Sequence, residues 1–287
     1  KMLALGFGLT AALIWAVHDL LARKLSQGAA LLPMIAVVIG AGCGLLLPVA
    51  LVAGDWGAMT GAAWGTAAAS GLAFSLAAGG LYKAFSLAPV RLVSPVIGAY
   101  PLLSLAIAAA QGRAVTALDW LAVAIIVGGI AIVALTTRQD GPDGYAAPPG
   151  VALGWAALAA LGFAATFALG QAATRMGSEL PVALVARGAA ALVILALLVL
   201  RDRRGRVAPG QIWILMVIGL LDALALTLVT ASGGLDRAEY ASVASSLFGM
   251  LTVLLAAWFL KERVRPVQWL GIATVFSGIM LLSLHSA

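Results

Sequence analysis

Apolar residues run along this chain in long, nearly continuous stretches, separated by short groups of charged, glycine, proline and turn-forming residues. A helix needs about 20 apolar residues to cross the hydrocarbon core of a bilayer, whereas the strands of an outer-membrane barrel alternate between lipid-facing and lumen-facing residues. The pattern therefore predicts an all-α integral membrane protein with ten transmembrane helices. The predicted helices cover residues 3–25, 30–53, 62–86, 90–111, 117–136, 151–174, 181–200, 211–233, 239–260 and 267–284.

The composition excludes a water-soluble domain. Of the 287 residues, 63% are apolar and only 10% are charged, whereas soluble domains carry about 25% charged residues. The positive residues behind the net charge of +6 lie in short loops, so we expect the lipid bilayer as a partner and no nucleic acid. The single cysteine, Cys43, excludes an internal disulfide, and with two histidines in the chain we expect neither a metal site nor a cofactor.

The two halves of the chain resemble each other. A linker-like stretch at 137–150 falls near the midpoint, and we expect five-helix units at residues 1–139 and 150–287. Because each unit has an odd number of spans, the second would enter the membrane upside down, giving two inverted five-helix repeats around a central cavity that holds a ligand at their interface. A shift of 148 aligns Trp15 with Phe163, Leu32-Pro33 with Leu180-Pro181 and Gly40 with Gly188, and a shift of 149 aligns Trp120 with Trp269 and Gly112-Arg113 with Lys261-Glu262.

Loop charges predict the orientation, because cytoplasmic loops carry an excess of Lys and Arg. One side of the predicted bundle holds twelve such residues and the other side holds four. The richer side includes the loop at 201–206, which places that loop in the cytoplasm and both termini outside. We therefore expect a multi-pass protein of the cell inner membrane.

Two pairs of glycines have the small-xxx-small spacing that lets helices approach each other closely. They are Gly40 with Gly44 and Gly61 with Gly65. We expect these pairs to pack helices within one chain rather than to specify a dimer, and we expect a monomer.

A set of short motifs extends over both halves of the chain. They are Leu13-Ile14-Trp15-Ala16, Tyr82-Lys83-Ala84, Pro95, Pro101 and the ending Leu260-Lys261-Glu262…Gln268-Trp269-Leu270-Gly271…Gly278. With them the chain resembles the ten-span EamA branch of the drug/metabolite transporter superfamily, and within it the YddG-type exporters of aromatic amino acids. Arg113 departs from the family pattern, which has an acidic residue there in the first copy, and Met250 departs from it in the second copy, which has a proline. The resemblance implies a basket of ten helices around a cavity that opens to each side in turn.

An ionisable residue at bilayer depth costs about 2.5–3.5 kcal/mol on insertion scales and needs an explanation, and four such residues stand out in the predicted spans. They are His18, Asp19, Arg187 and Asp222. Arg187 and Asp222 lie at depths that differ by only about 5 Å on adjacent helices, so they form a structural ion pair, or Asp222 faces the cavity and meets an ammonium group or a proton. His18 and Asp19 share a helix face with Trp15, and they form either an interfacial cluster or part of the cavity wall.

Aromatic and hydroxyl side chains complete the candidate site. Phe74, Phe163 and Phe167 are packing residues or cavity residues, whereas the hydroxyls of Tyr82 and Tyr100 need a polar partner and favour the cavity. The serines of the ninth predicted helix pack closely or bind substrate. The residues that we expect to bind substrate are Trp15, His18, Tyr82, Tyr100, Phe163, Ser245 and Asp222.

The predicted function is that of a secondary transporter which exports amino acids, aromatic ones above all, or similar small metabolites by alternating access. The halves would rock about Pro95, Gly98 and Pro101, where helix hydrogen bonds are lost. The alternatives are export of drugs, nucleotides or other metabolites of the same superfamily, a channel, or an integral membrane enzyme. The sequence holds no phosphate-binding loop, zinc-protease motif or nucleophile elbow, so we expect a transporter of a small amino-acid-like molecule and no enzyme.

Overall fold

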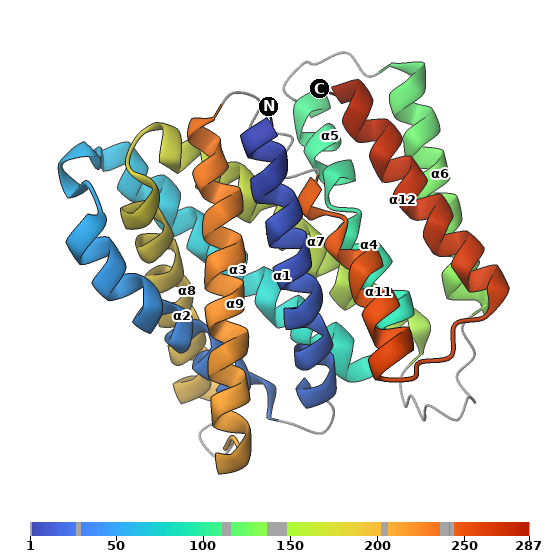
Figure 1. Ribbon diagram of the computed structural model, residues 1–287, viewed down its shortest axis with the longest axis horizontal. Coiled ribbons are helices and arrows are strands. Elements are labelled where there is room, and N and C mark those ends of the chain that lie inside the picture. Colours follow the sequence, from blue (N-terminus) through green and yellow to red (C-terminus); the bar gives the residue numbers. More distant parts are fainter. Residues whose placement is uncertain are drawn as a thin grey trace.

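A computed structural model describes residues 2–26, 30–110, 116–136, 148–201, 206–235, 241 and 244–286. Within these ranges all regular elements are helices, and they form one helical bundle (Figure 1). The helices are α1 (Met2–Ser26), α2 (Leu31–Ala53), α3 (Gly61–Leu87), α4 (Val90–Gly98), α5 (Pro101–Ala110), α6 (Ala117–Thr136), α7 (Pro149–Arg175), α8 (Glu179–Arg201), α9 (Ile212–Ala231), α11 (Phe248–Phe259) and α12 (Pro266–Ser286), with 3₁₀ turns η1 (Trp56–Ala58), η2 (Pro209–Gln211) and η3 (Ser232–Gly234).

Each of the ten predicted segments contains helix. Five candidate spans are long and apolar enough to cross a membrane on their own: α1, α2, α7, α8 and the stretch Pro209–Gly234 around α9. Shorter apolar helices occupy Val90–Leu103, Ala117–Val133, Phe248–Phe259 and Pro266–Leu281. The remaining helix, α3, is rich in alanine and glycine and packs against α7 and α8. The chain is therefore a multi-pass, all-helical membrane protein.

The fourth predicted span is not one helix. It divides into α4 and α5 at Ala99 and Tyr100. Pro101 has no N–H, and its ring clashes with the carbonyl four residues earlier. The backbone therefore tightens into i→i−3 hydrogen bonds, with Ala99 N–H donating to Val96 O at 3.2 Å and Tyr100 N–H donating to Ile97 O at 3.2 Å.

A second break lies at Ser246 and Leu247, just before α11. Leu247 N–H donates to Ala244 O at 3.3 Å, again an i→i−3 bond. The repeat shift of the sequence places this break at nearly the position equivalent to the α4–α5 break, although no proline is present here. In both halves, therefore, the fourth predicted helix is interrupted at nearly the same position of the repeat. The predicted range 239–260 includes residues 239, 240, 242 and 243, which lie outside the described residues.

Helices of the two halves interleave (Figure 1). In the repeat alignment, α1, α2, α3, α5 and α6 correspond to α7, α8, α9, α11 and α12. The packing pairs follow this correspondence: α1 packs on α9 as α7 packs on α3, α2 on α9 as α8 on α3, and α1 on α11 as α7 on α5. The pairs α2–α8 and α6–α12 each join equivalent helices. Exchanging the halves reproduces the same contacts, as a pseudo-two-fold relation requires.

Two glycines mark the equivalent close contacts. A Cβ atom on Gly71 of α3 would lie 2.0 Å from the Ala186 carbonyl oxygen of α8, and one on Gly219 of α9 would lie 2.1 Å from the Val38 carbonyl oxygen of α2. The predicted packing role of the pairs Gly40/Gly44 and Gly61/Gly65 is wrong, because a Cβ atom at any of these four positions meets nothing within 4 Å. Spacing alone does not say which face of a helix meets a neighbour.

Candidate functional site

One face of α1 carries three large buried side chains. Trp15, His18 and Asp19 are all at most 4% exposed, whereas Leu13 and Val17 on the other face are 61% and 44% exposed. Residues three and four apart on a helix lie on the same side, and the structure confirms this for the three residues predicted to share a face.

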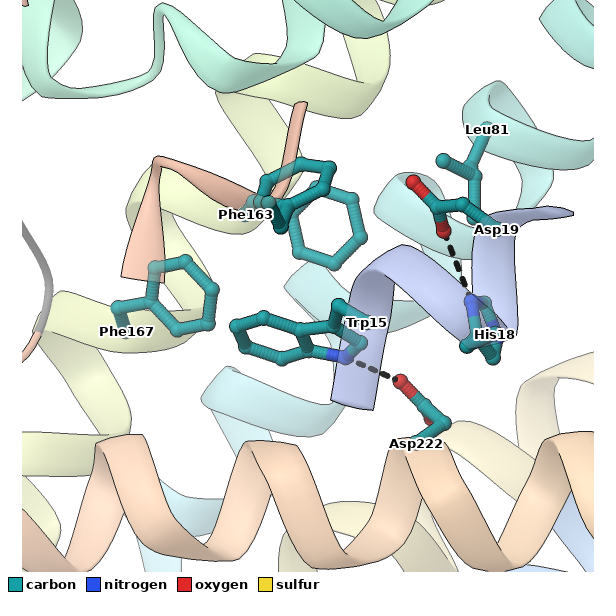
Figure 2. Close-up of a pocket in the computed structure, with 8 residues that line it drawn as sticks. Trp15, His18, Asp19, Leu81, Phe163, Phe167 and Asp222 are labelled. Atoms are coloured by element: carbon teal, nitrogen blue, oxygen red, sulfur yellow. Dashed lines mark hydrogen bonds and ion pairs between the residues drawn. The ribbon is translucent and has the colours of Figure 1, made fainter. Parts of the chain in front are cut away.

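Two adjoining narrow cavities lie against this face, and each leaves room for about one water molecule. They share His18, Leu81, Phe163 and Asp222, so α1, α3, α7 and α9 all contribute, two helices from each half. Figure 2 shows the first cavity, where the rings of Trp15, Phe163 and Phe167 lie opposite the polar groups of His18, Asp19 and Asp222. The first cavity also includes Leu81 and Phe248, and the second includes Ile35, Val38, Ile39, Phe74, Ala78 and Tyr82.

Asp222 connects both halves of the chain. Its Oδ2 accepts a hydrogen bond from Arg187 Nη2 at 2.6 Å, and its Oδ1 accepts one from Trp15 Nε1 at 3.1 Å. The ion pair with Arg187 that the helix depths predicted is confirmed. Asp222 also lines both cavities. It therefore forms the ion pair with Arg187 and faces the cavity at the same time.

Arg187 is 1% exposed and is held from three sides. Its guanidinium carbon lies 5.2 Å from the centroid of the Phe74 ring, within cation–π range. On the α2 side it packs over Gly42, where a Cβ atom would lie 2.5 Å from Nη1. A glycine at this position therefore makes room for a buried guanidinium at the level of Asp222.

His18 lies between a carboxylate and a phenol. Its Nδ1 lies 2.8 Å from Asp19 Oδ1, and its Nε2 lies 3.3 Å from the hydroxyl of Tyr82. A neutral imidazole has one donor and one acceptor nitrogen, so Nδ1–H can donate to Asp19 while Nε2 accepts from Tyr82. The other carboxylate oxygen of Asp19, Oδ2, is buried and has no hydrogen-bond partner among the described residues.

Aromatic rings form the remaining wall. The Phe167 ring centroid lies 5.6 Å from that of Trp15, 5.8 Å from that of Phe163 and 5.0 Å from that of Tyr100. The Tyr100 hydroxyl in turn lies 2.7 Å from Ser245 Oγ, within hydrogen-bond distance. Each of these two residues lies beside one of the helix breaks, so this contact joins the two interrupted helices next to the cavity.

The structure brings the seven predicted binding residues into one connected cluster. Trp15, His18, Phe163 and Asp222 line the first cavity, Tyr82 lines the second, and Tyr100 and Ser245 contact the ring of Phe167 or each other. The predicted set missed four residues of the first cavity, namely Asp19, Leu81, Phe167 and Phe248. The helical spacing from Trp15 could have indicated Asp19, and the spacing of four from Phe163 could have indicated Phe167, whereas nothing in the sequence singles out Phe248.

A second charged cluster lies about one helical turn beyond Asp19 on α1. Arg23 donates through Nε to Glu262 Oε1 at 3.4 Å and through Nη1 to the Phe85 carbonyl. Glu262 also accepts from the backbone N–H of Val90 at 3.3 Å and lies 3.9 Å from Arg91 Nη1. All three charged side chains are less than 9% exposed. This cluster ties α1 and α4 to the segment after α11.

In the described part of the chain, no three His, Cys, Asp or Glu side chains lie close enough together to hold a metal ion. The charged groups of the site instead pair with each other or with aromatic partners. The site thus places aromatic rings beside a small group of charged side chains.

Comparison with known proteins identifies a family pattern. The sequence profile of the EamA-like transporter family matches residues 2–135 and again residues 150–284. No protein of curated function matches the chain. A crystal structure of another protein superposes with a TM-score of 0.67 over 99% of this chain and 98% of its own length. Since the two sequences are 20% identical, that similarity shows a shared fold alone.

Proposed function

The chain belongs to the EamA-like transporter family, with two copies of the family unit, and on this premise we propose that it exports amino acids, aromatic ones above all, by alternating access. As a family member it is a membrane transporter of small metabolites. The finer assignment, export of aromatic amino acids in the manner of the YddG type, rests on the lining of its cavity.

The observation that carries this proposal is the combination of rings and charges at the interface of the halves. Trp15 and Phe248 lie at 5.9 Å between centroids, and Phe163 stacks on Phe167 at an interplanar angle of 21°. Ring pairs add about 0.5–1.5 kcal/mol beyond the area that they bury, which favours a flat aromatic side chain as ligand. His18, Asp19 and Asp222 offer polar contacts for the other end of an amino acid.

The same lining argues against the alternatives within the superfamily. Nucleotides and nucleotide sugars carry phosphates, which need several cationic or N–H donors. Among the described residues, no Lys or Arg lines the two cavities, and the neighbouring Arg187 is already bound to Asp222 at 2.6 Å. We therefore place amino acids before phosphorylated metabolites.

Transport requires the cavity to open, because in the narrow form described above it has no room for an aromatic amino acid. The two breaks at Ala99–Tyr100 and Ser246–Leu247 are the places where the backbone can bend, together with Pro95, Gly98 and Pro101. The Tyr100–Ser245 contact and the Arg23–Glu262 cluster hold the closed form. We propose that the ten helical segments all cross the inner membrane of the cell, that both termini lie outside, and that a monomer carries out the cycle.

Counterflow in proteoliposomes tests the function. Vesicles loaded with unlabelled L-phenylalanine should take up labelled L-phenylalanine transiently and with saturation. Unlabelled tyrosine or tryptophan should compete more strongly than alanine or glutamate. Flux that rises linearly with concentration would indicate a channel, and protein-containing vesicles without counterflow of any amino acid tested would refute the proposal.

A further inference from the structure

A third cavity lies on the far side of the Arg187–Asp222 pair. Asp222 lines the two cavities described above, whereas Arg187 lines this third one, which leaves room for about one water molecule. We propose that this outer cavity is a second substrate site, which holds the ammonium and carboxylate groups of an α-amino acid as it leaves and makes no contact that selects the side chain. The inference rests on the proposed function and extends it to the release side of the protein.

The outer cavity is displaced toward one end of the bundle. Each helix that lines both this cavity and the inner two contributes to it a residue nearer to the end that carries Asp55 and Ser178. These residues are Leu46 on α2, Ser70 on α3, Gly170 on α7 and Thr227 on α9. In the proposed topology Asp55 and Ser178 lie outside, so the outer cavity lies between the Arg187–Asp222 pair and the outer face of the membrane.

The repeat relation makes the outer cavity the counterpart of the second inner cavity. With the shift of 148, five of its residues align with residues that line the second cavity: Ala183 with Ile35, Ala186 with Val38, Arg187 with Ile39, Leu226 with Ala78 and Thr230 with Tyr82. Alternating access in an inverted-repeat carrier moves one repeat against the other about the site between them. Equivalent cavities on the two halves therefore serve opposite faces of the membrane.

The two counterparts differ in chemistry. Where the second cavity has Ile39 and Tyr82, the outer cavity has Arg187 and Thr230. Among the described residues that line the outer cavity there is no aromatic side chain. A substrate held there gains none of the ring contacts of the inner site, so its side chain contributes little to binding and its charged groups contribute most.

Arg187 supplies the donor for a carboxylate. Its Nη2 is bound to Asp222 Oδ2 at 2.6 Å, but its Nη1 is buried and has no hydrogen-bond partner among the described residues. A guanidinium has five N–H groups in a planar fork and no acceptor, so Nη1 needs an oxygen. One carboxylate oxygen is about the size of the water molecule for which the outer cavity has room.

Three hydroxyl groups supply acceptors for the ammonium. Ser70, Thr227 and Thr230 line the outer cavity, and each donates its hydroxyl proton to a backbone carbonyl, at 2.9, 2.7 and 2.9 Å respectively. With their protons engaged in this way, the hydroxyl oxygens keep lone pairs as acceptors. An ammonium group has three N–H donors and no acceptor, which fits this set of oxygens.

A glycine keeps the space between these groups open. A Cβ atom on Gly170 would lie 2.6 Å from Thr230 Cγ2 and 3.4 Å from Ser70 Oγ. Any side chain at position 170 would therefore press on two of the three hydroxyl residues. Gly154, on the same helix, has nothing within 4 Å of its Cβ position, so it provides a matched control for filling the cavity.

Charge balance favours a zwitterion over either of its halves. Arg187 is the charged residue among the described residues that line the outer cavity, and Asp222 compensates it. A zwitterionic amino acid leaves this balance unchanged. A carboxylate or an ammonium alone would add a net charge inside the membrane protein, which is costly.

Protection of a cysteine tests the inference. In a Cys43→Ser background, Thr227→Cys in intact cells should react from outside with the impermeant reagent 2-sulfonatoethyl methanethiosulfonate. L-Alanine and L-phenylalanine, each at about ten times its Kd, should both slow this reaction about tenfold. Propionate and ethylamine should need about tenfold higher concentrations or more, since each lacks one charged contact. Ser178→Cys, outside the cavity, is the control, and its rate should not respond to any of the four compounds.

A variant that fills the cavity gives a second measurement on purified protein. L-Alanine should raise the unfolding midpoint of the wild type and of Gly154→Ala, and it should leave that of Gly170→Ala unchanged. Protection of Thr227→Cys by L-phenylalanine but not by L-alanine would overturn the inference, as would protection by ethylamine equal to that by L-alanine. An unreactive Thr227→Cys would also overturn it. If Thr227→Cys fails to fold, a wild type that L-alanine does not stabilise refutes the outer site.

The outcomes separate this inference from the proposed function. Phenylalanine counterflow without protection of Thr227→Cys by L-alanine would leave export of aromatic amino acids standing and refute the outer site. Protection by L-alanine without counterflow of any amino acid would support the outer site and refute the proposed export.

Discussion

Trp15 donates its indole N–H to Asp222 Oδ1 at 3.1 Å, across 207 positions of sequence and from the first half of the chain to the second. The bond places a cavity-lining ring and a cavity-lining carboxylate in fixed relation, and Arg187 holds the carboxylate from the other side at 2.6 Å. The interface of the halves is thus also a wall of the cavity, and a movement of one half against the other must change the shape of that cavity.

Asp222→Asn should destabilise the protein because it leaves the Arg187 guanidinium buried without a counter-charge. Breaking a buried pair from one side costs about 3–5 kcal/mol, so the midpoint of thermal unfolding in detergent should fall by several degrees or more. The double variant Arg187→Met/Asp222→Leu removes both charges and should regain part of the loss. If Asp222→Asn left the unfolding midpoint unchanged, the pair would have no structural role.

Tyr82→Ala should weaken transport of aromatic substrates. It removes a ring that lines the second cavity and the hydroxyl that lies 3.3 Å from His18 Nε2. Losses of about 1–2 kcal/mol for the ring and hydrogen bond together correspond to a KM for L-phenylalanine raised roughly tenfold. Tyr82→Phe keeps the ring and should show a smaller change. Unaltered kinetics of Tyr82→Ala at normal expression would remove this residue from the site.

Gly71→Ala and Gly219→Ala should each lower the yield of folded protein. Their new Cβ atoms would lie 2.0 and 2.1 Å from the carbonyl oxygens of Ala186 and Val38, so backbone must shift, and overpacking of this kind costs about 1–3 kcal/mol. Gly79→Ala on the same helix as Gly71 is the control, because its Cβ meets nothing within 4 Å. Size-exclusion profiles and unfolding midpoints of the three variants give the comparison. Equal behaviour of Gly71→Ala and Gly79→Ala would contradict the close approach of α3 and α8.

The arrangement of the halves predicts which loops are accessible from each face of the membrane. In a Cys43→Ser background, single cysteines at Asp55 and Ser178 should react with an impermeant maleimide from outside. Cysteines at Val207 and Arg263 should react from the cytoplasmic side alone. Labelling each of the four variants in whole cells and in inside-out vesicles shows from which face its cysteine is accessible. Reaction of Asp55→Cys and Val207→Cys from the same face would contradict the ten-span inverted topology.

Much of this protein could be predicted from its sequence because hydropathy and depth are properties of single segments. The apolar runs located helical segments but not the breaks at Ala99–Tyr100 and Ser246–Leu247. The repeat shift indicated two copies of one unit, as the family profile also does, and residue counting placed Arg187 level with Asp222. The cost of a phenol in hydrocarbon predicted that Tyr82 and Tyr100 have polar partners, and the structure supplies His18 and Ser245. Each inference needed only the position of a residue along its own helix.

What the tertiary structure alone decided depends on how each helix is rotated and which neighbour it meets. The spacing of glycines predicted the wrong packing pairs. Two helices approach closely only where a glycine on one helix faces the backbone of the other, and the spacing does not show which glycines do so. The break at Ser246–Leu247 lies beside no proline, so the sequence gives no signal for it. In the packed structure it lies close to the α4–α5 break, where Tyr100 contacts Ser245. The unbonded Oδ2 of Asp19 and the ring of Phe248 became visible only when five helices closed around them. The free energy needed to bury a polar or charged side chain follows from the residue type and its depth in the membrane. Which partner offsets that free energy is determined by how the helices pack.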